Sequence, residues 1–342
     1  MSSAIPAVFH GQPLPPREEI LANTRICTLP MNVKFRGVLE RETALIQGPA
    51  GWGEFAPFVE YQPAEASSWL ACALEAAWLG FPAPKRQEIP LNSTVPAVAA
   101  EKVPEVLARY QGVIREVKIK VAEKGQTLDD DLARIQAVAR AVPDARLKVD
   151  ANGGWNEKQA VEALSRLEEF NLLYVEQPVS TVEGLVAVRQ TIRERGNQML
   201  IAADESVRKA EDPLRVARMG AADLLIVKAA PLGGVSRALS IVQQAGMPVV
   251  VSSALESSVG IRMGAALAAA LPELPYGCGL GTVSLLRQDV ARTPYVAHNG
   301  VLQLQDVEPA EELMKQSEPS AERVLWWRER IALCYAHLQQ YK

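Results

Sequence analysis

The sequence predicts an α/β protein, a modified TIM-type (β/α)7β barrel joined to an α+β capping domain. From about residue 116 onward, short β-branched runs alternate with longer segments of helical periodicity. Successive runs lie about 24 to 30 residues apart, close to one strand–helix unit of a barrel that uses about 250 residues for eight units. An open, doubly wound sheet would share this alternation. However, no G-x-G-x-x-G pattern follows the first run. Six clear strand–helix units and a shorter seventh are also more than we expect in such a sheet.

The predicted barrel strands are six clear runs and a shorter seventh. They are EVKIKV (116–121), RLKVDAN (146–152), LLYVEQP (172–178), MLIAADES (199–206), DLLIVKAAP (223–231), PVVVSSALES (248–257) and a segment near GCGLGT (277–282). The segments at 128–142 and 156–170 carry apolar residues at three- and four-residue spacing and acidic first turns. This pattern is typical of helices that cover a parallel sheet.

The two ends of the chain have a different pattern. In the first 110 residues, RICTLPMNVKF, GVLERETALIQG and GWGEFAPF predict short antiparallel strands, and residues 63–81 predict a helix. Near the other end, residues 295–304 predict a hairpin that turns at Asn299-Gly300, and residues 320–340 predict a helix. We therefore predict a capping domain over 1–110, a barrel over 111–290, and a segment over 291–342 that returns to the cap.

Composition narrows the range of partners. The 342 residues carry a formal net charge of −4, and no long basic run offers the concentrated positive surface that nucleic acid requires. The four cysteines are far apart and form no C-x-x-C pair, so we expect neither a disulfide framework nor a zinc ribbon. We expect a cytoplasmic protein that acts on a small molecule and does not insert into a membrane; the oligomeric state stays open.

Charged residues recur at the carboxyl ends of five successive predicted strands, where the catalytic groups of a parallel barrel lie. They are Lys118 and Lys120, then Asp150, Glu176, Asp204 and Lys228. Because strand residues two apart point the same way, Lys118 and Lys120 are expected to share the inward face. Buried charges cost several kcal/mol each by order of magnitude unless they are paired or bound to a metal, so a compensating partner is expected.

The three carboxylates offer oxygen ligands from neighbouring strands. Asp150, Glu176 and Asp204 therefore predict a site for a hard cation, Mg²⁺ first and Mn²⁺ second. The simpler alternative is that each carboxylate caps the helix after its strand, but three of them flanked by lysines favour the metal site.

Lysines on opposite sides of these carboxylates suit enolate chemistry. Lys120 and Lys228 could flank a carboxylate substrate, with a positioned base contributing about 10²–10⁴-fold to proton removal and the metal stabilising the charge that develops. For Lys118 three roles stay open: it could bind a substrate carboxylate, lower the pKa of its neighbour or form an ion pair.

The ordered strings VKIKV, VDAN, VEQP, ADES and IVKAAPLGG resemble the enolase superfamily, specifically its muconate-lactonising-enzyme subgroup, and GWGEFAP resembles that subgroup's cap signature. Within it, SALESSVG (253–260) followed by GCGLGT is similar to a dehydratase of menaquinone biosynthesis, which acts on 2-succinyl-6-hydroxy-2,4-cyclohexadiene-1-carboxylate. The resemblance implies a lyase in which Lys120 removes the α proton and then assists departure of the β-hydroxyl. It also implies that Lys228 and the metal stabilise the enediolate.

Further residues are candidates for substrate binding. Asn152 could orient the site, Ser252 and Ser253 could contact the substrate, and backbone amides near Gly233 and Ser257 could bind a carboxylate at a helix amino terminus. Tight strand–helix packing is the alternative for the glycine and serine turns. Lys148 shares the parity of Asp150, and it either joins the site or only pairs with a carboxylate.

Three other functions remain open. A racemase of N-acylamino acids would use Lys120 and Lys228 as bases on opposite faces of one enolate, and the sequence barely separates it from the dehydratase. Cycloisomerisation of muconate is less favoured. A non-catalytic metal-binding scaffold would require either lysine to be dispensable.

Overall fold

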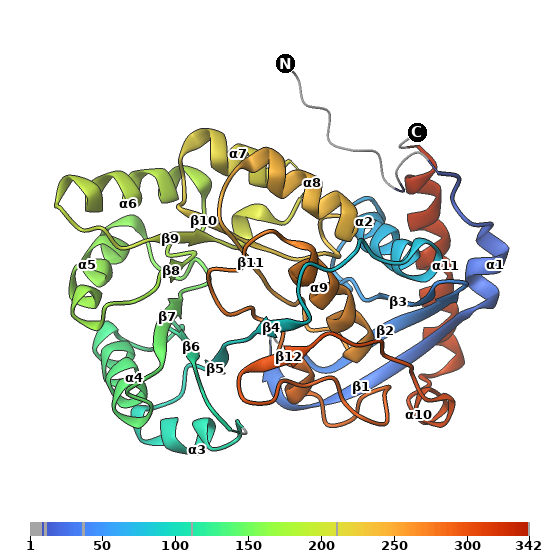
Figure 1. Ribbon diagram of the computed structural model, residues 1–342, viewed down its shortest axis with the longest axis horizontal. Helices are drawn as coiled ribbons and strands as arrows, with labels where there is room; N and C mark the ends of the chain where they lie inside the picture. The colour runs from blue at the N-terminus through green and yellow to red at the C-terminus, as the bar shows by residue number, and fades with distance from the viewer. Residues whose placement is uncertain (1–8, 10–11, 36–37, 111, 210, 341–342) are drawn as a thin grey trace.

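The computed structural model describes the 342 residues apart from 1–8, 10–11, 36–37, 111, 210 and 341–342. A curled parallel sheet with helices around it lies beside an antiparallel sheet that is covered by helices from both ends of the chain (Figure 1). The α/β barrel and the α+β cap predicted from the sequence are both confirmed.

The parallel sheet contains seven strands in the order β11-β10-β9-β8-β7-β6-β5. Their bounds are β5 (Ser93–Val95), β6 (Glu116–Lys120), β7 (Arg146–Asp150), β8 (Val175–Glu176), β9 (Ile201–Ala203), β10 (Leu224–Val227) and β11 (Val249–Val251). Between its two edges, parallel bridges join Ser252 to Gly279 and Cys278 to Leu91. The GCGLGT segment therefore connects the two edges through isolated bridges rather than as a regular strand.

Helices follow the strands and cover the sheet. They are α3 (Val103–Leu107), α4 (Leu128–Ala141), α5 (Glu157–Leu167), α6 (Val182–Glu194), α7 (Asp212–Met219), α8 (Val235–Ala245) and α9 (Ser258–Ala270), with short 3₁₀ turns η3 (Ala100–Lys102), η4 (Glu168–Phe170), η5 (Glu205–Val207) and η6 (Thr282–Leu285). Capping boxes at Thr127 and Asn156 begin α4 and α5, since each side chain accepts from a backbone amide three residues later. Both helices confirm the periodicity read from the sequence.

The cap is built on an antiparallel sheet of β1 (Thr24–Phe35), β2 (Val38–Gly48) and β3 (Gly51–Phe55). Its helical elements are α1 (Arg17–Ala22), α2 (Pro63–Leu74), the π-helical turn η2 (Glu75–Leu79), α10 (Glu311–Gln316) and α11 (Ala321–Leu338). Helix α11 packs on α2, and Trp327 meets Phe55 edge to face at 5.7 Å between ring centroids. The final helix thus lies against the amino-terminal sheet.

A small two-stranded sheet pairs β4 (Glu88–Pro90) with β12 (Val301–Gln303). The predicted turn at Asn299 and Gly300 is present, and their φ angles of 53° and 72° suit it. The hairpin predicted over 295–304 is reduced to one isolated bridge between His298 and Val301, because β12 pairs with β4 instead. Strand β5 lies inside the 1–110 segment assigned to the cap but pairs with β6 in the parallel sheet. The domain limits themselves stay a prediction.

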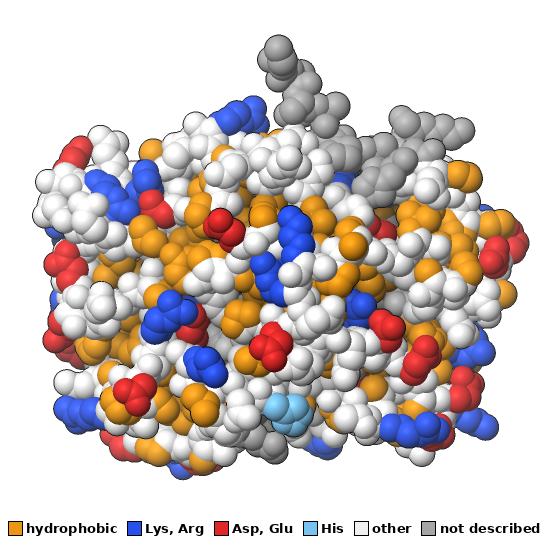
Figure 2. Space-filling view, viewed as in Figure 1, with side chains coloured by type: hydrophobic (Ala, Val, Ile, Leu, Met, Phe, Trp, Pro, Cys, Tyr) orange, Lys and Arg blue, Asp and Glu red, His pale blue; other side chains and the backbone are white. Residues whose placement is uncertain are grey.

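On the face drawn in Figure 2, acidic and basic side chains are interspersed rather than gathered into one extended area. Among the described residues, no helix is both long enough and apolar enough to cross a membrane.

The four cysteines, for which no disulfide framework was expected, are buried free thiols. They are Cys27, Cys72, Cys278 and Cys334.

Candidate active site

Strand register brings the predicted charged residues together at one end of the parallel sheet. Lys120 is level with Asp150, and Asp150 is level with Glu176. Glu176 is in turn level with Ala202, and Asp204 follows two residues later. The sheet order β6-β7-β8-β9-β10 therefore places three carboxylates in a row, with Lys120 on one side and Lys228 on the other.

The three lysines are bonded to these carboxylates. Lys118 Nζ lies 3.1 Å from both Asp150 Oδ2 and Glu176 Oε1. Lys120 Nζ donates to Asp150 Oδ2 at 2.5 Å and to Asn152 Oδ1 at 2.6 Å. Lys228 Nζ donates to Asp204 Oδ1. Because all three carboxylates are buried, the lysines supply the compensating charge that burial demands.

The crowding of charge changes the protonation of the site. Burial, followed by the neighbouring Asp150 carboxylate, raises the pKa of Glu176 to about 8. Burial would also raise the pKa of Asp150, but Lys120 and Lys118 outweigh it and lower that pKa. Burial disfavours the ammonium of Lys118, yet Glu176 and Asp150 prevail and raise its pKa. Lys118 is therefore held charged between two carboxylates. The ion pair is one of the three roles left open for it, and a contact with the substrate stays a prediction.

The row offers carboxylate oxygens, which are the ligands that a hard cation prefers, and all three carboxylates are buried. As placed in the described part of the chain, however, no three His, Cys, Asp or Glu side chains are grouped so that they could hold a metal ion. The oxygens are instead bonded to lysine ammonium groups. A divalent ion would neutralise the same carboxylates, so the residues fit such an ion in chemistry and in strand position.

Two amide side chains support this row. Asn152 has a φ of 46°, accepts from Lys120 and donates to Glu205 Oε1 at 3.2 Å. Gln177 is fully buried, and its Oε1 accepts from the backbone amides of Asp204 at 3.0 Å and Ser206 at 3.2 Å. Gln177 thus fixes the turn that presents Asp204. It was missed in the sequence analysis, although it directly follows Glu176 in the string VEQP.

The helix amino termini proposed for a substrate carboxylate are occupied by carboxylates of the cap. Glu54 of β3 accepts from Ser257 N at 3.1 Å and Gly260 N at 2.7 Å at the start of α9. Glu75 of η2 accepts from Val235 N and Ser236 N at the start of α8. A Cβ at Gly234 would lie 2.3 Å from Glu75 Oε2, so this glycine admits the glutamate.

The remaining candidates for substrate binding have partners within the protein. Gly233 N donates to Ala230 O at 3.1 Å, and the Ser257 hydroxyl donates to Glu54. Ser253 shares a 2.9 Å hydrogen bond with Thr282, and Ser252 N donates to Val227 O at 2.9 Å. Their contacts with a substrate stay a prediction. The structure shows instead that Gly233 and Ser257 lie where the cap joins the barrel.

Lys148 lies toward the amino-terminal end of the parallel sheet. It is fully buried, and its Nζ lies 3.1 Å from Glu116 Oε2, 2.7 Å from Gly277 O and 5.2 Å from the ring centroid of Tyr174. Glu116, at the start of β6, also accepts from Gly277 N at 2.7 Å. Of the two roles considered for Lys148, the ion pair is the one seen.

We expect Lys148→Met to destabilise the fold by about 3 kcal/mol, because removing one partner of a buried pair leaves the other charge under-compensated. This loss of stability should be at the low end of the range usual for a broken buried ion pair, because Arg146 still contacts Glu116. Urea unfolding measures the stability, and KM for the substrate should not change. A raised KM at unchanged stability would place Lys148 in the site instead.

A second buried acid, Glu256, predicts a pH-dependent stability. Burial, and then the nearby Glu54 carboxylate, raise its pKa to about 7 from an ordinary value of 4.5. Between about pH 4.5 and pH 7 the folded chain keeps the proton on Glu256, whereas the unfolded chain has lost it. The contribution of Glu256 to the free energy of unfolding therefore falls as the pH rises through this range. We expect Glu256→Gln, which keeps an oxygen for Ala254 N, to be more stable than wild type by about 1–3 kcal/mol at pH 8. Unfolding curves should show this advantage shrinking toward pH 5; an advantage that does not depend on pH would contradict the assignment.

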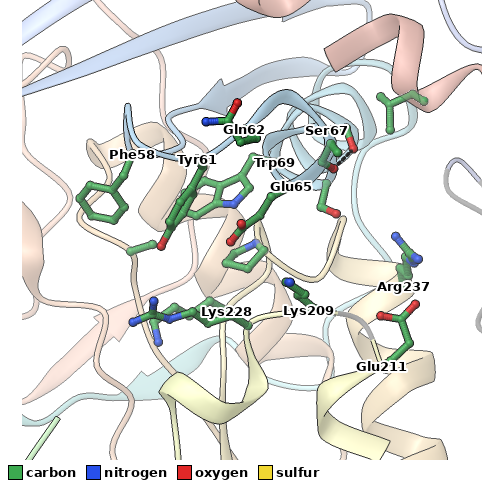
Figure 3. Close-up of a pocket in the computed structure, with 16 residues that line it drawn as sticks. Phe58, Tyr61, Gln62, Glu65, Ser67, Trp69, Lys209, Glu211, Lys228 and Arg237 are labelled. Atoms are coloured by element: carbon green, nitrogen blue, oxygen red, sulfur yellow. Dashed lines mark hydrogen bonds between the residues drawn. The ribbon is translucent and has the colours of Figure 1, made fainter. Parts of the chain in front are cut away.

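A cavity of about 430 Å³ opens beside Lys228, between the cap and the barrel. Phe58, Tyr61 and Trp69 of the cap line one side, and Lys209 and Lys228 line the other (Figure 3). Arg208, Lys209 and Glu211 also line it. They could not be recognised from the sequence, because they follow the ADES string in a segment without periodicity.

A parallel barrel with carboxylates and lysines on successive strand ends, joined to a cap at that end, defines the enolase class of barrel protein. Residues 99–309 match the family described as Enolase C-terminal domain-like, and residues 26–77 match the one described as Enolase N-terminal domain-like. The chain belongs to the enolase superfamily.

Its relatives are highly similar over almost their full lengths. It is 52% identical over 324 residues to the o-succinylbenzoate synthase of Mycolicibacterium smegmatis, covering 94% of this chain and 98% of that protein. It is 49% identical over 326 residues to the o-succinylbenzoate synthase of Mycobacterium tuberculosis, covering 95% and 97%.

Solved structures confirm the fold. The muconate lactonizing enzyme of Pseudomonas fluorescens, complexed with muconolactone, has a TM-score of 0.74 at 22% identity and covers 87% of this chain and 98% of that one. The muconate lactonizing enzyme of Pseudomonas putida has a TM-score of 0.71 at 20% identity, covering 86% and 98%. The matches to the two family models confirm the resemblance to this superfamily stated from the sequence.

Proposed function

We propose that the chain catalyses the syn-dehydration of 2-succinyl-6-hydroxy-2,4-cyclohexadiene-1-carboxylate to 2-succinylbenzoate, the o-succinylbenzoate synthase reaction of menaquinone biosynthesis. The observation that carries this proposal is the row of three buried carboxylates with Lys120 on one flank and Lys228 on the other. The similarity to o-succinylbenzoate synthases over nearly the whole chain supports it. A reducing cytoplasm suits the buried free thiols.

Lys120 is the base and then the acid in this mechanism. Its neutral amine takes the proton from C1 of the substrate, and the electron pair moves into the carboxylate to give an enediolate. The pair then returns to the ring and expels the C6 hydroxyl, which leaves as water with the proton that Lys120 carries. One lysine serves both steps because the proton and the hydroxyl are on the same face.

The other residues of the site stabilise the charges that the reaction develops and those of the buried carboxylates. Lys228, on the opposite flank, stabilises the enediolate through its ammonium group in this mechanism, and Lys118 balances the charges of Asp150 and Glu176. Asp150, Glu176 and Asp204 are the proposed ligands of Mg²⁺, with Mn²⁺ as a substitute. When bound, the metal supplies positive charge next to the substrate carboxylate, which makes the C1 proton more acidic. Asn152 orients Lys120 through the 2.6 Å hydrogen bond.

Racemisation of N-succinylamino acids is the second candidate, because lysines on both flanks provide a base for each face of an enolate. Purified protein with Mg²⁺ should be given the cyclohexadiene acid and, separately, an N-succinylamino acid in D₂O. Rapid aromatisation, followed by ultraviolet absorbance, is expected. Exchange of the α proton for deuterium without aromatisation would exclude dehydration and favour racemisation.

A further inference from the structure

The cavity beside Lys228 has a shape and a charge that the mechanism at the carboxylate row does not use. It occupies about 430 Å³, and Lys228 is one of its lining residues, so it is continuous with the proposed site. Aromatic side chains of the cap form its apolar wall, where Tyr61 packs against Phe58 and Trp69 at centroid distances of 5.9 and 6.2 Å. This wall suits the ring and methylene groups of a ligand.

The opposite wall is basic. Arg208, Lys209 and Arg237 line it together with Lys228, against the two carboxylates of Glu65 and Glu211. The cavity therefore carries a net positive charge although the whole chain is acidic. An apolar wall facing a basic one is complementary to a ligand that ends in a carboxylate.

Arg208 is the residue best placed to bind that carboxylate. It follows η5 directly and comes four residues after Asp204, so the element that presents a proposed metal ligand also presents this arginine to the cavity. Its NH2 lies 3.5 Å from Glu205 Oε1, a long contact, and its side chain is 36% exposed. A guanidinium offers five N–H donors in a planar fork, which matches a carboxylate in two-point contact.

We propose that this cavity binds the second, side-chain carboxylate of the substrate, and that Arg208 is the residue that recognises it. The ligand class is a ring carboxylate with a second carboxylate at the end of a short keto chain. This inference rests on the proposed function, whose substrate has this form. The ring carboxylate then lies at the metal ligands while the succinyl chain extends past Lys228 along the aromatic wall.

The test compares two ligands that differ only at the distal group: 2-succinylbenzoate, and 2-butanoylbenzoate, which has a methyl group in place of the carboxylate. Calorimetric titration of the Mg²⁺-loaded protein should show that wild type prefers 2-succinylbenzoate by about 10- to 100-fold, as expected for a hydrogen-bonded charge pair. Arg208→Met should lose this preference and bind 2-butanoylbenzoate as wild type does. Arg215→Gln, at an exposed arginine of α7 paired with Glu183, is the matched control and should keep the preference.

Retention of the full preference by Arg208→Met would overturn the assignment of Arg208, and so would an equal loss of affinity for both ligands. If that variant does not fold, Arg208→Gln tests the same loss of charge. Turnover of the cyclohexadiene acid by wild type is measured in parallel. Turnover without any preference for the second carboxylate would refute this inference alone, whereas absence of turnover would refute the proposed function.

Discussion

Replacing Lys120 by alanine should lower the rate of dehydration by about 10²–10⁴-fold, the contribution expected of a positioned acid–base group. In the structure, Lys120 donates to Asp150 and Asn152, and Lys118 is the other lysine that contacts Asp150 among the ion pairs of the described residues. Lys118 is bonded to both Asp150 and Glu176, and its raised pKa makes it a poor base. Lys118 is therefore not expected to take over proton removal.

The variant should still bind Mg²⁺, because the proposed ligands remain and a competing positive charge has been removed. Steady-state turnover and calorimetry on the same preparation separate these two properties. Lys124→Ala, at an exposed lysine beyond the end of β6, is the control and should keep wild-type activity. A Lys120→Ala protein with wild-type turnover would show that another group is the base.

Much of this site could be predicted from the sequence because it depends on parity and order. Charged residues at strand ends in a parallel sheet fall on one face and one edge, so Lys120, Asp150 and Glu176 are level as the spacing implies. The residue types of short segments were also enough to predict the turn at Asn299-Gly300 and the acidic first turns of the helices. These features need no knowledge of contacts between distant segments.

What the sequence could not show depends on such contacts. Gly233-Gly234 and Ser257 have the pattern of anion sites, but whether a ligand or a side chain fills them depends on how the cap docks. Glu75 and Glu54 come from segments about 160 and 200 residues earlier, and no local pattern indicates their destination. Strand β5 was missed for the same reason, since its three residues form a strand only by pairing with β6.

Removing the charge of Asp204 should also have a large effect. Unlike Lys120→Ala, which lowers the rate of proton transfer, this change should lower the affinity for the metal. We expect Asp204→Asn to weaken Mg²⁺ binding by at least about 100-fold, because changes to the outer partners of metal ligands alone cost about 10–100-fold. Its carboxylate is buried, Lys228 donates to it and Gln177 fixes the turn that holds it, so its loss removes one of the three buried anionic groups of the row. Direct titration with Mg²⁺ or Mn²⁺ measures the effect without requiring catalysis.

The matched control is Asp129→Asn, at an exposed aspartate of α4 that pairs with Arg166. It removes the same charge from the chain, so it separates a specific ligand from a general change in electrostatic potential. Circular dichroism should show that both variants are folded, because asparagine has nearly the same volume and Lys228 retains partial exposure to solvent. Wild-type affinity in Asp204→Asn would place the metal away from the row of carboxylates. Loss of affinity in Asp204→Asn alone would show that the carboxylate row, now paired with lysines, is where the cation binds.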